Sequence, residues 1–144
     1  MMRALVLMIC LAATARAEVR LVDAVKKADK TAVRALLQQR VDVNAAEPDG
    51  TTALHWAARV DDLETADLLI RGGANVKAAN RYGITPLSLA CINGNAAVIE
   101  LLLKAGADPN TASPEGETAL MTAARTGKVD AVKVLLAHGA DVNA

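Results

Sequence analysis

The apolar residues of this chain fall in short blocks that recur every 33 residues. In the central block, residues 83–110, the positions spaced i, i+3 and i+4 are Leu87, Ala90 and Cys91 and, after Gly94, Val98, Leu101 and Leu102. This spacing predicts two amphipathic helices with a glycine stop between them. Each helix would have only about two to three turns, which is marginal in isolation. We therefore expect helix pairs that complete their core, Leu102 included, by stacking on neighbouring pairs.

The central block aligns with residues 50–77 and 116–143 at shifts of 33 residues. We divide the chain into units at residues 47–79, 80–112 and 113–144, and the second helix of each unit is expected to stop at Gly73, Gly106 and Gly139. Residues 18–46 form a degenerate first copy with Ala28 and Arg40 at its stop positions. Either Arg40 has a positive φ or that helix ends differently. The dense charges of this copy, which we expect to form the polar outer face of a capping unit, are Arg20, Lys26, Lys27, Lys30 and Arg34.

A tetrapeptide that ends in glycine precedes each strong helix start. The three tetrapeptides are E-P-D-G, N-R-Y-G and S-P-E-G, and each is followed after one residue by Thr52, Thr85 or Thr118. Glycine in the last place suits a tight turn, and threonine can cap a helix start. Pro86 suits the first helical position because its missing N–H removes no helical hydrogen bond.

The fourth unit has no closing cap in this sequence, which stops at D-V-N-A. We expect the outer helical face of this unit, around Val132, Leu135 and Leu136, to lack a neighbour. This expectation suggests that the sequence is a fragment or that more repeats follow in the natural protein.

Residues 1–17 have the pattern of a secretory signal peptide. Arg3 precedes an apolar run of ten residues, and Ala15 and Ala17 form an A-x-A cleavage site before Glu18. The run is too short for a membrane span of about 20 residues. We expect cleavage and export to the periplasm, with secretion as the second choice and an uncleaved anchor as the alternative. A lipid anchor at Cys10 is disfavoured because Ile9 is not small.

The charge and the aromatic content of the chain limit the classes of ligand and the kind of core that it can have. The chain has 16 basic and 16 acidic side chains, and removal of Arg3 and Arg16 with the leader leaves 14 against 16, a net charge of −2. This balance argues against a nucleic acid as the main ligand. Phe is absent and Trp56 and Tyr82 are the only aromatic residues, which fits thin layers of short helices packed through Leu, Val and Ala.

The landmarks G-x-T-P-L-S-L-A-C, V-I-x-L-L-L and G-A-D-P-N, which recur in register, resemble the ankyrin repeat. The resemblance covers about residues 18–144, with three strong copies and one weak. It implies an all-α solenoid in which each unit has a β-hairpin-like turn and two antiparallel helices. It also implies that the Thr and His side chains of the T-P-L-H motif are structural. His55 is the one histidine at that position, and Ser88 and Met121 replace it in the later units.

Catalytic and metal chemistry have little support. A nucleophile would have to be Cys91 with His55 as base, but Cys91 takes the place of Ala58 and Ala124 and is better explained by packing. The potential metal ligands His55, His138 and Cys91 are far apart in sequence. We expect no cofactor, no metal and no enzymatic activity in these residues.

The remaining chemistry is recognition of a protein partner. In ankyrin repeats the partner contacts usually come from the turns and from the end of the first helix. Carried over unit by unit, these positions are Pro48, Asp49, Thr51, Arg59 and Val60; Arg81, Tyr82, Ile84, Ile92 and Asn93; and Pro114, Glu115, Glu117, Arg125 and Thr126. Tyr82 is the strongest candidate, although it could instead shield the next turn, and Trp56 is better explained by packing.

We interpret the chain as a monomeric, exported protein-binding module that acts as a scaffold, an inhibitor or a chaperone-like partner. The alternative is the N-terminal recognition region of a longer enzyme whose catalytic domain is absent from this sequence. A third interpretation is an immunity-type inhibitor of a secreted toxin.

Overall fold

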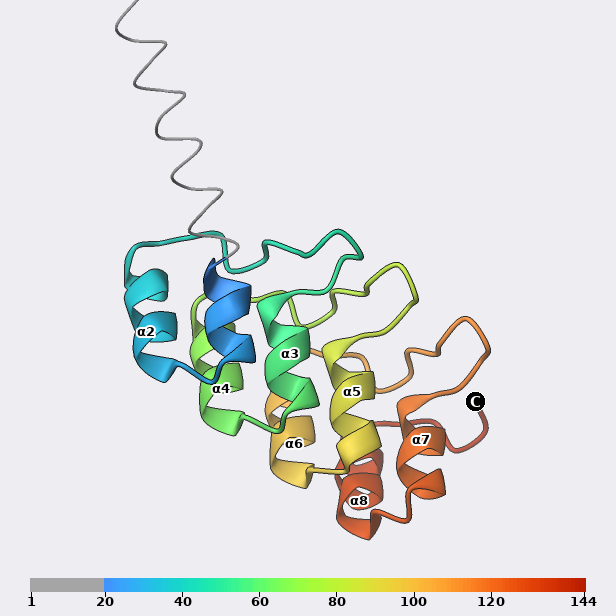
Figure 1. Cartoon of the computed structure of the whole chain (residues 1–144). Helices are drawn as coiled ribbons and strands as arrows, with labels where there is room; N and C mark the ends of the chain where they lie inside the picture. The colour runs from blue at the N-terminus through green and yellow to red at the C-terminus, as the bar shows by residue number, and fades with distance from the viewer. Residues whose placement is uncertain (1–19) are drawn as a thin grey trace, which may run out of the picture.

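The protein is a row of helix pairs stacked side by side in two layers (Figure 1). The computed structural model describes residues 20–144, so the predicted signal peptide at residues 1–17 lies outside the described residues. Residues 20–26 are helical, and the later helices are α2 (Lys30–Gln38), α3 (Ala53–Arg59), α4 (Leu63–Arg71), α5 (Pro86–Asn93), α6 (Ala96–Lys104), α7 (Ala119–Arg125) and α8 (Val129–Ala137). The first helices α3, α5 and α7 contact one another in order, and the second helices α2, α4, α6 and α8 do the same. The predicted all-α solenoid is confirmed.

The first helices begin as their sequences predict. Thr85 Oγ1 accepts a hydrogen bond from the Ser88 N–H at 3.2 Å, and Ser88 Oγ accepts one from the Thr85 N–H at 2.9 Å. Pro86 is the first residue of α5. Thr118 Oγ1 accepts from the Met121 N–H at 3.3 Å. These bonds satisfy donors that have no partner inside the helix.

The stop positions have left-handed backbone whether or not they are glycine. Gly73, Gly106 and Gly139 have φ of 95°, 106° and 89°, and Arg40 has φ of 55°. Ala28 and Asp61 have φ of 55° and 58° at the corresponding stops of two first helices. Arg40 therefore takes the first of its two predicted alternatives, because the repeat geometry imposes this conformation on a side chain that disfavours it.

Each turn before a first helix closes through a pair of backbone hydrogen bonds. In the third unit, Asn80 N donates to Ile84 O at 3.0 Å and Gly83 N donates to Asn80 O at 2.9 Å. Isolated antiparallel bridges join Ala46 to Thr52 and Ala112 to Thr118 in the neighbouring turns. The turn at residues 47–51 is also joined to the turn at residues 80–84, because Arg81 N donates to Asp49 O at 2.8 Å. These two turns are therefore directly connected.

Replacement of Gly83 by alanine should destabilise the protein through two effects. The φ of 74° costs an alanine about 1–2 kcal/mol, and its Cβ would lie 2.6 Å from Pro114 Cδ in the next turn. Gly116→Ala is the matched control, because Gly116 has φ of 85° and no neighbouring atom within 4 Å of an added Cβ. Urea unfolding should show a larger loss for Gly83→Ala. Equal losses would mean that the Pro114 contact does not matter.

The core lies between the helix pairs and is built from Leu, Val, Ile and Ala. Leu102, Ile99 and Leu69 are fully buried. The expectation that Leu135 lies on an outer face is wrong, because Leu135 is also fully buried. It occupies the position of Leu102 one period later, in a helix that contacts both α7 of its own unit and α6 of the unit before. Val132 is half-buried, and the large apolar residues exposed in the fourth unit are Met121, Val129, Leu136 and Val142.

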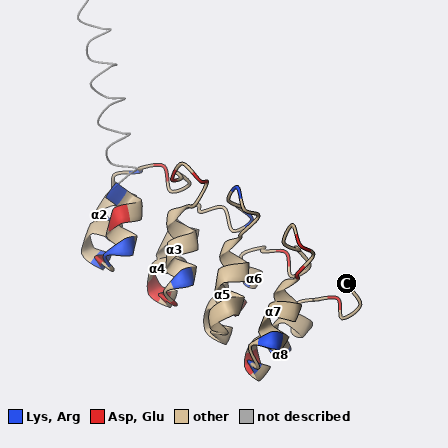
Figure 2. Cartoon of the chain, turned by 45° about the vertical axis from the view of Figure 1, so that its right-hand side comes forward, with Lys and Arg blue, Asp and Glu red and all other residues tan. Residues whose placement is uncertain are grey.

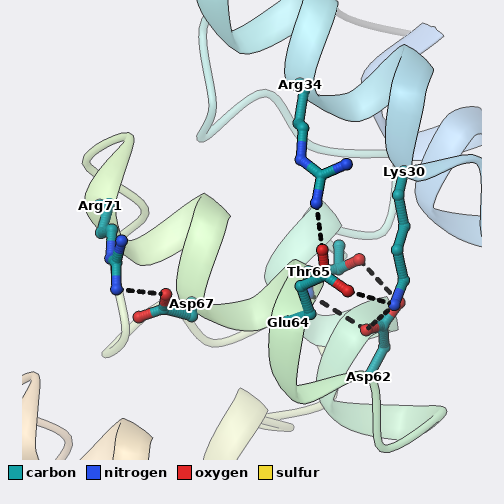
Figure 3. Close-up of polar contacts among 7 residues, drawn as sticks. All are labelled: Lys30, Arg34, Asp62, Glu64, Thr65, Asp67 and Arg71. Atoms are coloured by element: carbon teal, nitrogen blue, oxygen red, sulfur yellow. Dashed lines mark hydrogen bonds and ion pairs between the residues drawn. The ribbon is translucent and has the colours of Figure 1, made fainter.

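Ion pairs join the first unit to the second on the side of the second helices (Figure 3). Lys30 Nζ lies 2.6 Å from Glu64 Oε2 and 3.6 Å from Asp62 Oδ1, and Arg34 also pairs with Glu64. The hydrogen bond from Lys30 is the main cause that lowers the pKa of Glu64. The expectation of an outward polar face is thus wrong for Lys30 and Arg34, which reach toward the next unit, and for Lys26, which pairs with Glu47 there.

The helices in residues 20–144 are all too short or too polar to cross a membrane.

Candidate partner-binding face

The turns and the first helices together form one face of the solenoid, which we call the concave face. It comprises the turns at residues 47–51, 80–84 and 113–117 and the helices α3, α5 and α7, and the turns project beyond the helices on this side (Figure 1). Two hollows lie on it. The first hollow has a volume of about 210 Å³ and is lined by Asp49, Thr51, His55, Trp56, Arg59, Asn80, Tyr82, Ile84 and Leu89. The second hollow has about 140 Å³, and its lining includes Ile84, Ser88, Ile92, Glu117, Thr122 and Arg125.

Trp56 forms one wall of the first hollow and is held on several sides. Its Nε1 donates a hydrogen bond to Glu47 Oε2 at 2.8 Å. The Lys26 ammonium lies 4.6 Å from the ring centroid and the Arg59 guanidinium 5.3 Å. A cation within about 6 Å of an indole face is attracted by the electrons of the ring. Trp56 is half-buried, so it both packs in the fold and presents part of its surface to the hollow.

Tyr82 stands at the tip of the middle turn with 54% of its surface exposed. Its backbone N–H donates to Asn80 Oδ1 at 3.0 Å, which fixes the turn. The Arg81 guanidinium lies 4.9 Å from the Tyr82 ring centroid and donates to the Tyr82 hydroxyl at 2.7 Å. An aromatic residue held in this way can bury area in a complex with little loss of entropy.

His55 lies at the base of the first hollow and is fully buried. Its Nδ1 accepts a hydrogen bond from the Thr52 N–H at 3.1 Å. Its Nε2 lies 2.9 Å from Ile84 O in the next unit, so Nε2 is assigned as the protonated nitrogen that donates this bond. Burial lowers the pKa of His55. The neutral ring therefore fixes a helix start and joins two units at once.

The second hollow combines apolar and ionic walls. Ile92 is 55% exposed and Ile84 is 36% exposed. On the opposite side, Arg125 donates to Glu117 Oε1 from Nε at 3.1 Å and from Nη2 at 2.9 Å. The hydrogen bond from Arg125 lowers the pKa of the Glu117 carboxyl. The two charges of this hollow therefore neutralise each other.

None of the predicted contact residues is buried. The first hollow brings together Asp49, Thr51, Arg59, Tyr82 and Ile84, and the second brings together Ile84, Ile92, Glu117 and Arg125. Val60, Arg81, Pro48, Pro114 and Glu115 are exposed outside both linings, and Asn93 and Thr126 are half-buried.

Two of these side chains are engaged within the fold. Asn93 Nδ2 donates to Arg59 O at 2.7 Å and ties the end of α3 to α5. Thr126 Oγ1 donates to Ala123 O at 3.0 Å. Their polar atoms are therefore less available to a partner than those of Arg59 or Tyr82.

Sequence reasoning missed several residues that shape the hollows. Glu47 and Lys26 hold Trp56 in place, and Asn80 and Leu89 line the first hollow. A period of 33 relates Lys26 to Arg59 and Glu47 to Asn80. The alignment of units could thus have pointed to them, but the contacts between units could not be read from it.

The chemistry of the buried Cys91 does not suit a nucleophile. Cys91 is fully buried, and burial raises the pKa of its thiol to about 12. The reactive form of cysteine is the thiolate, so this thiol is inert at neutral pH. In the described part of the chain, no group of three or more His, Cys, Asp or Glu side chains is placed to hold a metal ion.

Stacked helix pairs with a projecting row of turns define a helical repeat protein of the solenoid class. The sequence matches the family model described as ankyrin repeats (3 copies) over residues 21–113 and again over residues 73–144. The chain therefore belongs to the ankyrin-repeat family. A comparison with curated proteins gives no match. Ankyrin repeats are generally protein–protein interaction modules, and the family is typically non-catalytic.

Proposed function

We propose that this chain binds another protein through its concave face and acts as a scaffold, adaptor or inhibitor without catalysis of its own. The observation that supports the proposal is the grouping of exposed Tyr82, Ile84 and Ile92 around two hollows. Pockets for cofactors and small ligands usually have about 300–1,000 Å³. Hollows of about 210 and 140 Å³ suit single side chains of a partner better.

The proposal includes export and action in the periplasm as a monomer. Its support is the sequence pattern of residues 1–17, with a basic start, an apolar run and the A-x-A site. Mass spectrometry of the protein from the periplasmic fraction should give a chain that begins at Glu18. A chain that retains residue 1 in the membrane fraction would favour the anchor instead.

A capture experiment with matched variants tests the binding face. The immobilised chain is exposed to a periplasmic extract of the cells that produce it. We expect the double variant Arg81→Ala, Tyr82→Ala to lose a protein that the wild type captures, because both side chains lie at the exposed tip of the middle turn.

The control is the double variant Arg71→Ala, Lys104→Ala on the second helices. Both residues are exposed, and each forms an ion pair within its own helix. The control should capture the same protein as the wild type. Equal capture by all three chains would place the binding surface elsewhere and contradict the proposal.

A further inference from the structure

The end of the first helix of each unit carries one corresponding position, and these positions differ in charge and in ion pairing. The row consists of Lys26, Arg59, Ile92 and Arg125, each 33 residues from the next. Lys26 is paired with Glu47, and Arg125 is paired with Glu117. The positions that correspond to these two acids around Arg59 are Asn80 and Thr51, which are neutral. Within residues 20–144 no carboxylate oxygen lies within 4.0 Å of the Arg59 guanidinium.

A second cation without a carboxylate partner stands beside the same hollow. The middle turn is basic through Arg81, whereas the turns on both sides of it are acidic (Figure 2). The Arg81 guanidinium is held against Tyr82, and Tyr82 lines the first hollow together with Arg59. In the described residues no carboxylate lies within salt-bridge distance of Arg81 either.

One acid, Asp49, lines this hollow, and its carboxylate already has a hydrogen-bond partner in its own turn. The carboxylate of Asp49 accepts a hydrogen bond from the Thr51 N–H at 2.9 Å. This bond is the main cause that lowers the pKa of Asp49, and the charge of Arg81 adds to it. One guanidinium group, that of Arg59, thus lines the first hollow and a second, that of Arg81, lies beside it against Tyr82, with a single carboxylate in the lining. This leaves a local excess of positive charge on a chain with no net charge.

The second hollow lies one unit further along the chain, and its surface is apolar where that of the first hollow is positively charged. Ile84 lines both hollows, and Ile92 replaces a basic residue in the row. Because Arg125 and Glu117 neutralise each other there, the free surface of the second hollow is mainly apolar. An extended peptide that crosses from α3 over α5 toward α7 therefore meets positive charge first and apolar surface next.

We infer that the partner presents an extended acidic segment, with a carboxylate side chain in the first hollow and a large apolar side chain in the second. Arg59 and Arg81 would bind the carboxylate, since guanidinium groups form strong paired hydrogen bonds with carboxylates. Ile84 and Ile92 would cover the apolar side chain. The inference rests on the proposed function of the concave face. A nucleic acid fits less well, because Glu115 on the adjacent turn would repel its phosphates.

Selection from a library tests this inference directly. Random linear peptides of about 12 residues, displayed on phage, are selected on the folded full chain. We expect enriched peptides to carry Asp or Glu at a fixed separation from Leu, Ile, Phe or Trp. A synthetic peptide with the enriched sequence should bind about tenfold or more weakly to Arg59→Ala, Arg81→Ala, and its affinity for the wild type should fall as salt is added.

Matched variants separate the possible outcomes. The control Lys77→Ala, Lys133→Ala removes the same charge from exposed positions outside both hollows and should keep the affinity. The selection could instead enrich peptides without acidic residues, which bind Arg59→Ala, Arg81→Ala as well as the wild type but do not bind Ile84→Ser, Ile92→Ser. This result would overturn the acidic segment but would still support binding at the concave face. Peptides that bind equally to all variants would overturn both, as would no enrichment. Equal binding of a single-stranded DNA of similar length would overturn a protein segment as the ligand.

Discussion

Replacement of Leu102 by alanine is expected to lower the free energy of unfolding by about 2–5 kcal/mol. Leu102 is fully buried in α6, the second helix of the third unit. Since α6 contacts α4 on one side and α8 on the other, a cavity there weakens two interfaces between units. The neighbours can close it only by moving helices that are fixed by their own turns, so we expect the loss to persist.

Urea unfolding followed by circular dichroism measures this loss. Ile92→Ala is the control, because it shortens a side chain of the same size in the same unit that is 55% exposed. The control should change stability by less than about 0.5 kcal/mol. A loss below about 1 kcal/mol for Leu102→Ala would place this side chain outside the core.

Replacement of His55 by alanine should cost about 2–4 kcal/mol, because a buried donor loses its acceptor and a carbonyl loses one of its two donors. The Thr52 N–H at the start of α3 loses its acceptor, and the Ile84 carbonyl in the next unit keeps only the hydrogen bond from Asn80 N. The change therefore weakens a helix start and an interface between units together. The same urea measurement reports the loss, and a cost below about 1 kcal/mol would contradict this double role.

His55→Ser separates the two roles, and the chain itself supplies the precedent. In the third unit, Ser88 Oγ accepts from the Thr85 N–H at 2.9 Å and caps α5 without a histidine. Serine at position 55 should therefore restore the cap but not reach Ile84. We expect a stability between those of the wild type and His55→Ala.

The stability of the wild type should also depend on pH through this residue. Burial lowers the pKa of His55 below its ordinary value of 6.5, so the unfolded chain takes up the proton first. The contribution is complete above pH 6.5 and is lost as the pH falls toward the folded pKa. The carboxylates with lowered pKa act only below about 4.5. His55→Ser should therefore flatten the decline between about pH 6.5 and pH 5.

Features repeated within the chain were predictable, because three copies provide three independent readings of each position. Thr85 and Thr118 start helices, and Gly73 and Gly106 end them. The positive φ of Arg40 follows from the same alignment, although its side chain alone would argue against it. At these positions the 33-residue repeat determines the backbone conformation more strongly than the preference of the individual residue does.

The features that the sequence did not reveal concern side chains whose neighbours come from another unit. Leu135 is buried because it matches Leu102, yet its place in the last unit of this sequence suggested an outer face. Asn93 lies at a variable position, but its amide reaches Arg59 O, 34 residues away. Lys30 pairs with Glu64 across the same kind of distance. Contacts at this separation depend on the relative position of two units, which a pattern within one unit does not contain.

The candidate site was predictable only in outline. The positions of Tyr82, Ile84 and Arg59 followed from their alignment with ankyrin repeats. The difference between Arg59 and its counterparts Lys26 and Arg125 did not, because it depends on which acids lie within reach in the folded chain.

The position of Trp56 has a practical consequence. It is the sole tryptophan of the chain, and it lies half-buried in the wall of the first hollow between Lys26 and Arg59. Indole emission moves to shorter wavelength when water is removed from the ring. The intrinsic fluorescence of this single residue should therefore report, without an attached dye, the binding of any molecule beside it.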